Sequence, residues 1–180
     1  MKQKGLIRFL WLGVLLVAGS CSINKENLDY RSHAPQITPE EIKRDKPNSV
    51  IIFIDPGCPG TPRYAPEIRK ELDMLKRKKV DYTLVADMLY TEKVDHELDD
   101  FKKKYGYDDE TIFLMNVKKY PKYGILKKKR FMDFMNDVCP KCDTLPLGPG
   151  LHVFLKDGKY YKHKLTYGLS PEDVEDMIRP

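Results

Sequence analysis

Residues 49–62 read SVIIFIDPGCPGTP, and this stretch decides the fold. It opens with a run of β-branched and aromatic side chains, which favours a strand buried on both faces, as in a central parallel sheet. The proline- and glycine-rich residues that follow predict a loop. From residue 63 to 79, Ile68, Leu72 and Leu75 recur at helical spacing. The stretch therefore predicts a buried strand that passes through a loop containing Cys58 into an amphipathic helix.

The residues after this helix alternate between strand and helix patterns. Asp157-Gly158 is typical of a hairpin turn, and Ser170-Pro171 is typical of a helix start. The predicted elements are a strand at 80–86, a helix at 92–105, a short strand at 111–117, a helix at 130–138, a hairpin with strands at 151–155 and 159–167, and a helix from 170. Alternating strands and helices followed by a hairpin predict an α/β fold whose sheet is parallel in one part and antiparallel at one edge.

The first twenty residues have the pattern of a secretory signal. Three basic residues precede an apolar segment, FLWLGVLLVA at 9–18, that is too short for a comfortable membrane span. Small residues then lead directly into Cys21, which resembles a bacterial lipobox, with Ala18 where leucine is commoner. We therefore predict a signal peptide over residues 1–20 and lipidation of Cys21. Ordinary cleavage near Ser20 is the alternative.

The predicted mature chain divides into a tether at 21–48 and a folded domain at 49–180. Residues 22–48 are polar and carry three prolines, and within them Thr38-Pro39 predicts a short helix start. The formal charge of +5 depends largely on the signal: without its three basic residues, 29 of the 32 remain against 27 acidic ones. So balanced a chain is not a nucleic-acid binder. We expect a lipid-anchored protein of the bacterial cell envelope, periplasmic or surface-facing, where disulfides persist.

The order of elements, with a cysteine just after the first core strand, resembles the thioredoxin-like superfamily over about residues 49–178. It looks closest to the secreted, membrane-tethered thiol–disulfide oxidoreductases of the TlpA/ResA type. Three stretches carry the resemblance: the strand running into Cys58, the sequence Ala-Pro-Glu-Ile at 65–68, and Pro149 eight residues before the Asp157 turn. The resemblance implies a three-layer α/β/α sandwich with a mixed central sheet and Cys58 as the nucleophile. It also implies a cis Pro149 beside the thiol, and protein thiols and disulfides as partners.

One departure from this family matters more than the matches. The family has Cys-x-x-Cys, whereas this chain reads Cys-Pro-Gly-Thr at 58–61, and the tryptophan that usually precedes the first cysteine is absent. A threonine cannot close the intramolecular disulfide that releases a substrate from the nucleophile. Cys58 nevertheless precedes a helix N-terminus, where the helix dipole and unpaired N–H groups favour a thiolate.

A second cysteine pair, Cys139-Pro-Lys-Cys142, precedes Pro149. Three interpretations stay open: a redox couple, one of whose members resolves Cys58; a structural disulfide; or two zinc ligands joined by Cys58 or His152. The chain has no second Cys-x-x-Cys and no His-x-x-x-His to complete a zinc site. We predict no metal and no cofactor. His152 opens a predicted core strand and is expected to be a structural histidine.

Three functions follow as hypotheses. The leading one is thiol–disulfide exchange, with Cys58 as the nucleophile and Cys139, Cys142 or an external thiol resolving the intermediate. The second is a catalytically inactive thioredoxin-fold binding module in an envelope complex, favoured by Thr61 and the missing tryptophan. The third is a thiol peroxidase, which is disfavoured because Asp55 stands where peroxiredoxins carry a threonine. Asp55 is also a candidate for proton transfer or for capping the turn.

Overall fold

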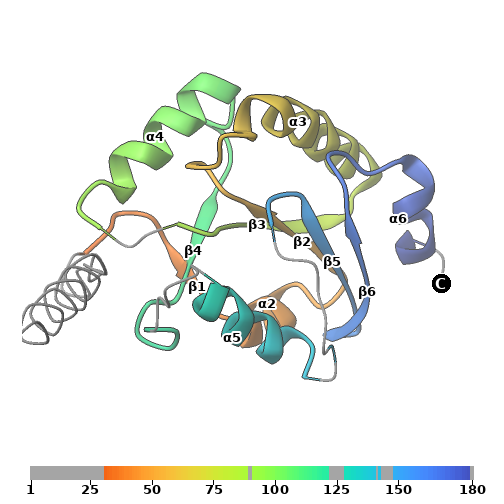
Figure 1. Cartoon of the computed structure of the whole chain (residues 1–180). Coiled ribbons are helices and arrows are strands. Elements are labelled where there is room, and N and C mark those ends of the chain that lie inside the picture. The colour runs from red at the N-terminus through yellow and green to blue at the C-terminus, as the bar shows by residue number, and fades with distance from the viewer. Residues whose placement is uncertain (1–30, 89–90, 122–127, 141, 143–147, 179–180) are drawn as a thin grey trace, which may run out of the picture.

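The structure is a computed structural model that describes residues 31–88, 91–121, 128–140, 142 and 148–178. These residues form one six-stranded mixed sheet with helices on both faces (Figure 1). The strands are β1 (Gln36–Ile37), β2 (Ser49–Ile54), β3 (Asp81–Ala86), β4 (Ile112–Met115), β5 (Leu151–Lys156) and β6 (Lys159–Leu165). The helices are α2 (Pro39–Asp45), α3 (Thr61–Lys78), α4 (Val94–Tyr105), α5 (Lys128–Val138) and α6 (Pro171–Ile178).

The sheet order is β1-β4-β3-β2-β5-β6. Strands β1 to β4 pair in parallel, and the β5–β6 hairpin joins β2 in antiparallel register, with Ser49 opposite Leu155. All six residues of β2 are buried, as the apolar run predicts. The mixed sheet between two helical layers confirms the predicted α/β/α sandwich. The element order is the one that the resemblance to the thioredoxin-like superfamily implies.

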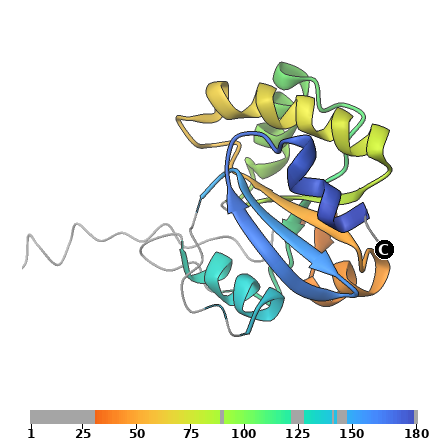
Figure 2. The ribbon, with the colours of Figure 1, turned by 90° about the vertical axis from the view of Figure 1, so that its right-hand side faces the viewer.

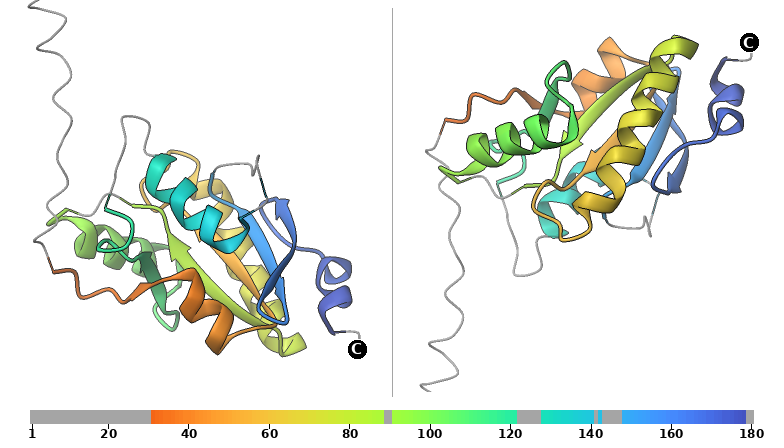
Figure 3. Two further views of the ribbon diagram at one scale, coloured as in Figure 1. Left: turned by 90° about the horizontal axis from the view of Figure 1, so that it is seen from below. Right: turned by 90° about the horizontal axis from the view of Figure 1, so that it is seen from above.

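Alternate residues of β2 divide the core into two halves. Ile52 and Ile54 face the layer that contains α3, α4 and α6, whereas Ile51 and Phe53 face the layer that contains α2 and α5. Figure 3 shows these two helical layers from below and from above, and Figure 2 shows the β5–β6 hairpin from the side.

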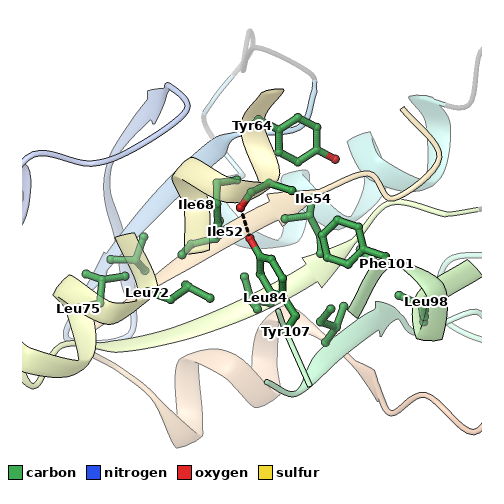
Figure 4. Close-up of a cluster of buried hydrophobic side chains, with 14 of the residues drawn as sticks. Ile52, Ile54, Tyr64, Ile68, Leu72, Leu75, Leu84, Leu98, Phe101 and Tyr107 are labelled. Carbon is green, nitrogen blue, oxygen red and sulfur yellow. Dashed lines mark hydrogen bonds between the residues drawn. The ribbon is translucent and has the colours of Figure 1, made fainter. Parts of the chain in front are cut away.

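The half of the core around α3 and α4 fixes the position of α3, the helix that follows Cys58. The predicted inner stripe of α4 is confirmed, because Val94, Leu98 and Phe101 are all buried. In Figure 4 the hydroxyl of Tyr107 reaches across this core to the carbonyl of Ala65, to which it donates a hydrogen bond of 2.7 Å. The bond ties the segment after α4 to the first half of α3.

The folded unit begins earlier than the predicted boundary at residue 49. Strand β1 pairs with β4, and α2 buries Ile42 to 1% exposure against the face that carries α5. The predicted helix start is confirmed: Thr38 caps α2 in a capping box with Glu41, and Pro39 occupies its first turn. Residues 36–45 therefore belong to the domain and not to the tether. Their few apolar residues lie at the spacing of a single helix turn, too short for a periodic signal.

The predicted signal peptide and Cys21 lie outside the described residues. In the part of the chain that the structure describes, no helix is long and apolar enough to cross a bilayer.

Candidate active site around Cys58

Cys58 lies in the loop between the end of β2 and the start of α3. Its thiol is free and partly buried. The backbone N–H of Cys58 donates to the carbonyl of Asp55 at 3.0 Å, and the N–H of Gly60 lies 3.4 Å from the Cys58 sulfur. Gly60 is the N-cap of α3 and provides no side-chain cap. The sulfur therefore lies beside a backbone donor at the positive end of an eighteen-residue helix, an environment that suits negative charge.

Thr61 occupies the position of the missing second cysteine. Its side chain is only 4% exposed, and its hydroxyl lies 2.6 Å from the carbonyl oxygen of Cys58 and 3.0 Å from that of Asp55. The Thr61 hydroxyl thus ties the start of α3 to backbone carbonyl groups of the preceding loop. This is a structural role, and it provides no group that could exchange electrons with Cys58.

Tyr64, on α3, holds the loop that contains Cys58. Its hydroxyl donates to the carbonyl of Asp55 and accepts the Asp55 N–H at 3.0 Å. Burial raises the pKa of the Tyr64 phenol to about 12. The ring stacks on that of Tyr167, with 5.7 Å between ring centroids. This phenol holds both polar groups of the Asp55 backbone and so sets where the Cys58 loop leaves β2.

The side chain of Asp55 has the turn-capping role that is one of its two predicted roles. Its Oδ1 accepts the N–H of Gly57 at 3.0 Å. The carboxylate therefore shapes the turn immediately before Cys58.

Cys58 opens into a groove of about 740 Å³. One wall is the loop from Pro56 to Pro62, and the other is α4, so we call it the α4 groove. The wall on α4 consists of Glu97, Asp100, Phe101, Lys103, Lys104 and Tyr105. The volume of the α4 groove falls within the range of ordinary ligand sites, about 300–1,000 Å³.

Pro149 lies at the same end of the sheet as the Cys58 loop. Its neighbour Gly150 donates its N–H to the carbonyl of Phe53 at 2.9 Å, near the end of β2. No peptide bond among the described residues is cis, so the expected cis form of Pro149 is wrong. The chain instead turns here through two glycines with positive φ, Gly148 at 152° and Gly150 at 82°. A side chain at Gly150 would lie 2.6 Å from the carbonyl oxygen of Thr166, so only glycine fits.

Cys139 and Cys142 form a disulfide at the end of α5. Two residues before it, the carbonyl of Asp137 accepts a bond of 2.6 Å from the amine of Lys43, and the carbonyl of Lys43 lies beside the β5–β6 turn. That turn is at the end of the sheet where β2 begins, whereas Cys58 follows the end where β2 finishes. Helix α5, whose end carries the pair, also packs on the face of the sheet opposite from α3 (Figure 2). The structure therefore does not bring the pair near Cys58.

The disulfide also occupies the two thiolates that a zinc site would need. Among the described residues, no group of three or more His, Cys, Asp or Glu side chains could hold a metal ion. His152 is fully buried, and its Nε2 lies 3.0 Å from the carboxylate of Glu71 on α3. The burial and the pairing with Glu71 agree with the predicted structural role of this histidine, although its buried Nδ1 has no hydrogen-bond partner among the described residues.

The α4 wall of the groove and the contact of Tyr64 with Asp55 were not predicted. A helical stripe at 97, 100, 101 and 104 is visible in the sequence, but nothing there says that it faces Cys58. Tyr64 follows Cys58 by six residues, which indicates closeness to the loop without indicating the bond.

No protein-family model and no curated protein matches the chain. Among solved structures, it is similar to a secreted Mycobacterium tuberculosis disulfide oxidoreductase homologous to E. coli DsbE. The two share 17% identity over 74% of this chain and 81% of that chain, with a TM-score of 0.42. It is also similar to M. tuberculosis DsbF, with 15% identity over 74% and 79% of the two chains and a TM-score of 0.41. Because both scores are low, the fold and the site rest on the geometry given above.

Proposed function

We propose that this protein is a thiol–disulfide exchange protein of the bacterial cell envelope, with Cys58 as its nucleophile and a lipid anchor on Cys21. The observation that carries the proposal is a free, partly exposed Cys58 at the start of α3, at the edge of a groove of ligand size. The Cys139–Cys142 disulfide agrees with an oxidising compartment.

The proposed reaction uses one thiol of the protein. The Cys58 thiolate attacks one sulfur of a substrate disulfide, which forms a mixed disulfide and releases the other substrate sulfur as a thiolate. A second, external thiolate then attacks the substrate sulfur of the mixed disulfide and releases Cys58 as a thiolate. An external thiol takes this role because Thr61 holds the loop and the Cys139–Cys142 pair lies at the other end of the sheet.

The test is turnover of bis(2-hydroxyethyl) disulfide with an external thiol as the reductant. We expect Cys58→Ser to lose activity by at least a hundredfold, because no other described thiol is free. The matched control is the double variant Cys139→Ser/Cys142→Ser, which should keep the wild-type rate. Equal rates for the wild type and Cys58→Ser would end the proposal.

The alternative is a binding module without catalysis, and Thr61 is the observation in its favour. The two functions differ in the reactivity of Cys58 towards iodoacetamide in the folded protein. Exchange requires Cys58 to be alkylated without denaturant. Complete protection of Cys58 would favour the binding module.

The lipid anchor is tested separately from the chemistry. A bacterial host that expresses the full chain should incorporate labelled palmitate into the wild type and not into Cys21→Ser. The variant should also move from the membrane fraction to the soluble fraction. Label that stays in Cys21→Ser would contradict lipidation at this residue.

A further inference from the structure

The α4 groove carries opposite charges at its two ends. On α4, Glu97, Asp100 and Lys104 recur at intervals of three and four residues, so they lie along one face of the helix, the face that lines the groove. Glu97 and Asp100 precede the buried Phe101, and Lys103 and Lys104 follow it. The groove thus has an acidic end and a basic end on one continuous helical wall.

These charges are largely unused within the protein. In the part of the chain that the structure describes, Glu97, Lys103 and Lys104 make no ion pair, whereas Asp100 pairs with the exposed His96 at 2.9 Å. The amine of Lys104 lies 5.3 Å from the ring centre of Tyr105, which holds it over the wall of the groove. Two cations of the neighbouring helix α3, Arg69 and Lys76, are by contrast both paired with Asp109. The charged side chains that line the α4 groove are therefore available to pair with a ligand.

The spacing of the two ends limits the size of that ligand. Seven residues separate Glu97 from Lys104, which corresponds to about 10 Å along an α-helix. Three extended residues span about 10–11 Å. A tripeptide with a free ammonium and a free carboxylate at its ends matches this distance, and the other wall of the groove is the Cys58 loop.

We infer that the α4 groove binds short zwitterionic cysteine peptides, about three residues long, as the exchange partners of Cys58. The inference rests on the proposed function and adds its substrate class. The ammonium lies at Glu97 and Asp100, the carboxylate at Lys103 and Lys104, and the cysteine sulfur at Cys58. Phe101, Tyr105 and the prolines of the loop form the apolar surface beneath the disulfide.

This substrate class also provides the resolving thiol. The Cys58 thiolate attacks the peptide sulfur of a disulfide that contains one peptide, which forms the mixed disulfide and releases the other sulfur of that disulfide as a thiolate. The thiolate of a second peptide then attacks the first peptide's sulfur, which forms a peptide disulfide and releases Cys58 as a thiolate. The starting disulfide is the oxidant and the second peptide thiol is the reductant. In this mechanism the loop at 55–61 needs no second thiol, because a peptide provides it.

The test compares two charge reversals that are matched in number and place. Lys103→Glu/Lys104→Glu changes the last turn of α4, and the control Arg77→Glu/Lys78→Glu changes the last turn of α3, outside the groove. With the disulfide of the peptide Gly-Cys-Gly as the probe, we expect the reversal on α4 to raise KM at least fivefold and the control to leave it unchanged. With the uncharged bis(2-hydroxyethyl) disulfide, the control should match the wild type, and the KM of Lys103→Glu/Lys104→Glu should change much less than with the peptide disulfide.

A binding measurement separates failure of this inference from failure of the proposed function. S-methylated Gly-Cys-Gly should bind to Cys58→Ser, and Lys103→Glu/Lys104→Glu in that background should weaken binding at least fivefold. Glu97→Gln should weaken binding of this probe and not of its N-acetylated form. Binding without turnover by the wild type would overturn the exchange function and keep the site. Turnover of bis(2-hydroxyethyl) disulfide by the wild type, together with no effect of Lys103→Glu/Lys104→Glu or Glu97→Gln on turnover or binding of the peptide probes, would overturn the peptide site and keep the exchange function.

Discussion

At the scale of single residues, the chemistry of the site depends on which side chains are hydrogen-bonded to the loop and which stay free. Thr61 and Tyr64 are both buried, and their hydroxyls bond to backbone groups of the loop. Of the cysteines that the structure describes, Cys58 is the free one, and it is partly exposed. The identity of residue 61 therefore decides between exchange with one thiol and exchange with two.

Thr61→Cys should convert the protein to the two-thiol mechanism. Cysteine and threonine are similar in size, and residues three apart at a helix start are close enough for a disulfide. After mild oxidation we expect Cys58 and the new cysteine to be linked, as measured by loss of two alkylation sites in mass spectrometry. Thr61→Val is the control and should keep Cys58 alkylatable. Two thiols that stay free in Thr61→Cys would show that the loop geometry differs from the one described.

At the scale of elements, α2 shows where sequence patterns fail. The buried strand β2 and the helices α3 and α4 could be predicted because each has many apolar residues in a clear period. Helix α2 has seven residues, and only Pro39 and Ile42 are buried, so only its cap was visible in the sequence. The proximity of α4 to Cys58, and the distance of α5 from it, depend on tertiary packing that no local pattern encodes.

Ile42→Ala tests whether α2 belongs to the domain. The side chain is 1% exposed, so its truncation should cost about 2–5 kcal/mol of unfolding free energy, measured by urea denaturation. Arg44→Ala, on the exposed side of the same helix, should change it by less than about 0.5 kcal/mol. A small effect of Ile42→Ala on the unfolding free energy would show that residues 36–45 are part of the tether and not of the folded domain.

The Cys139–Cys142 disulfide has a structural role in this account. It closes a loop of only four residues, so the double variant Cys139→Ser/Cys142→Ser should lose about 2 kcal/mol of unfolding free energy. The rate of Cys58 alkylation should stay as in the wild type. A large fall in that rate would instead couple the pair to the site.

At the scale of the whole molecule, phenols with raised pKa values, one buried and one half-buried, predict a loss of stability at alkaline pH. Burial raises the pKa of Tyr64 and of Tyr82 to about 12, above the ordinary value of 10.0. The neutral phenol is therefore favoured in the folded state. Its contribution is fully present below pH 10 and is lost as the pH rises through about 12.

The unfolding free energy should accordingly fall between about pH 10 and pH 12, as measured by urea denaturation. Tyr64→Phe should show a smaller fall than the wild type, although it is less stable at pH 8 because Asp55 loses two hydrogen bonds. Tyr161→Phe is the control, since this side chain is 46% exposed, and should fall as the wild type does. An equal fall in Tyr64→Phe would contradict the role given to burial.

The central claim is that Cys58 exchanges disulfides without a resolving thiol in the protein. Its most direct test is the intact mass of the mature wild-type protein after incubation with bis(2-hydroxyethyl) disulfide. The account predicts one adduct per chain, located at Cys58 by peptide mapping, that persists until an external thiol is added. An unmodified chain, or an adduct that disappears as Cys58 pairs with Cys139 or Cys142, would contradict it.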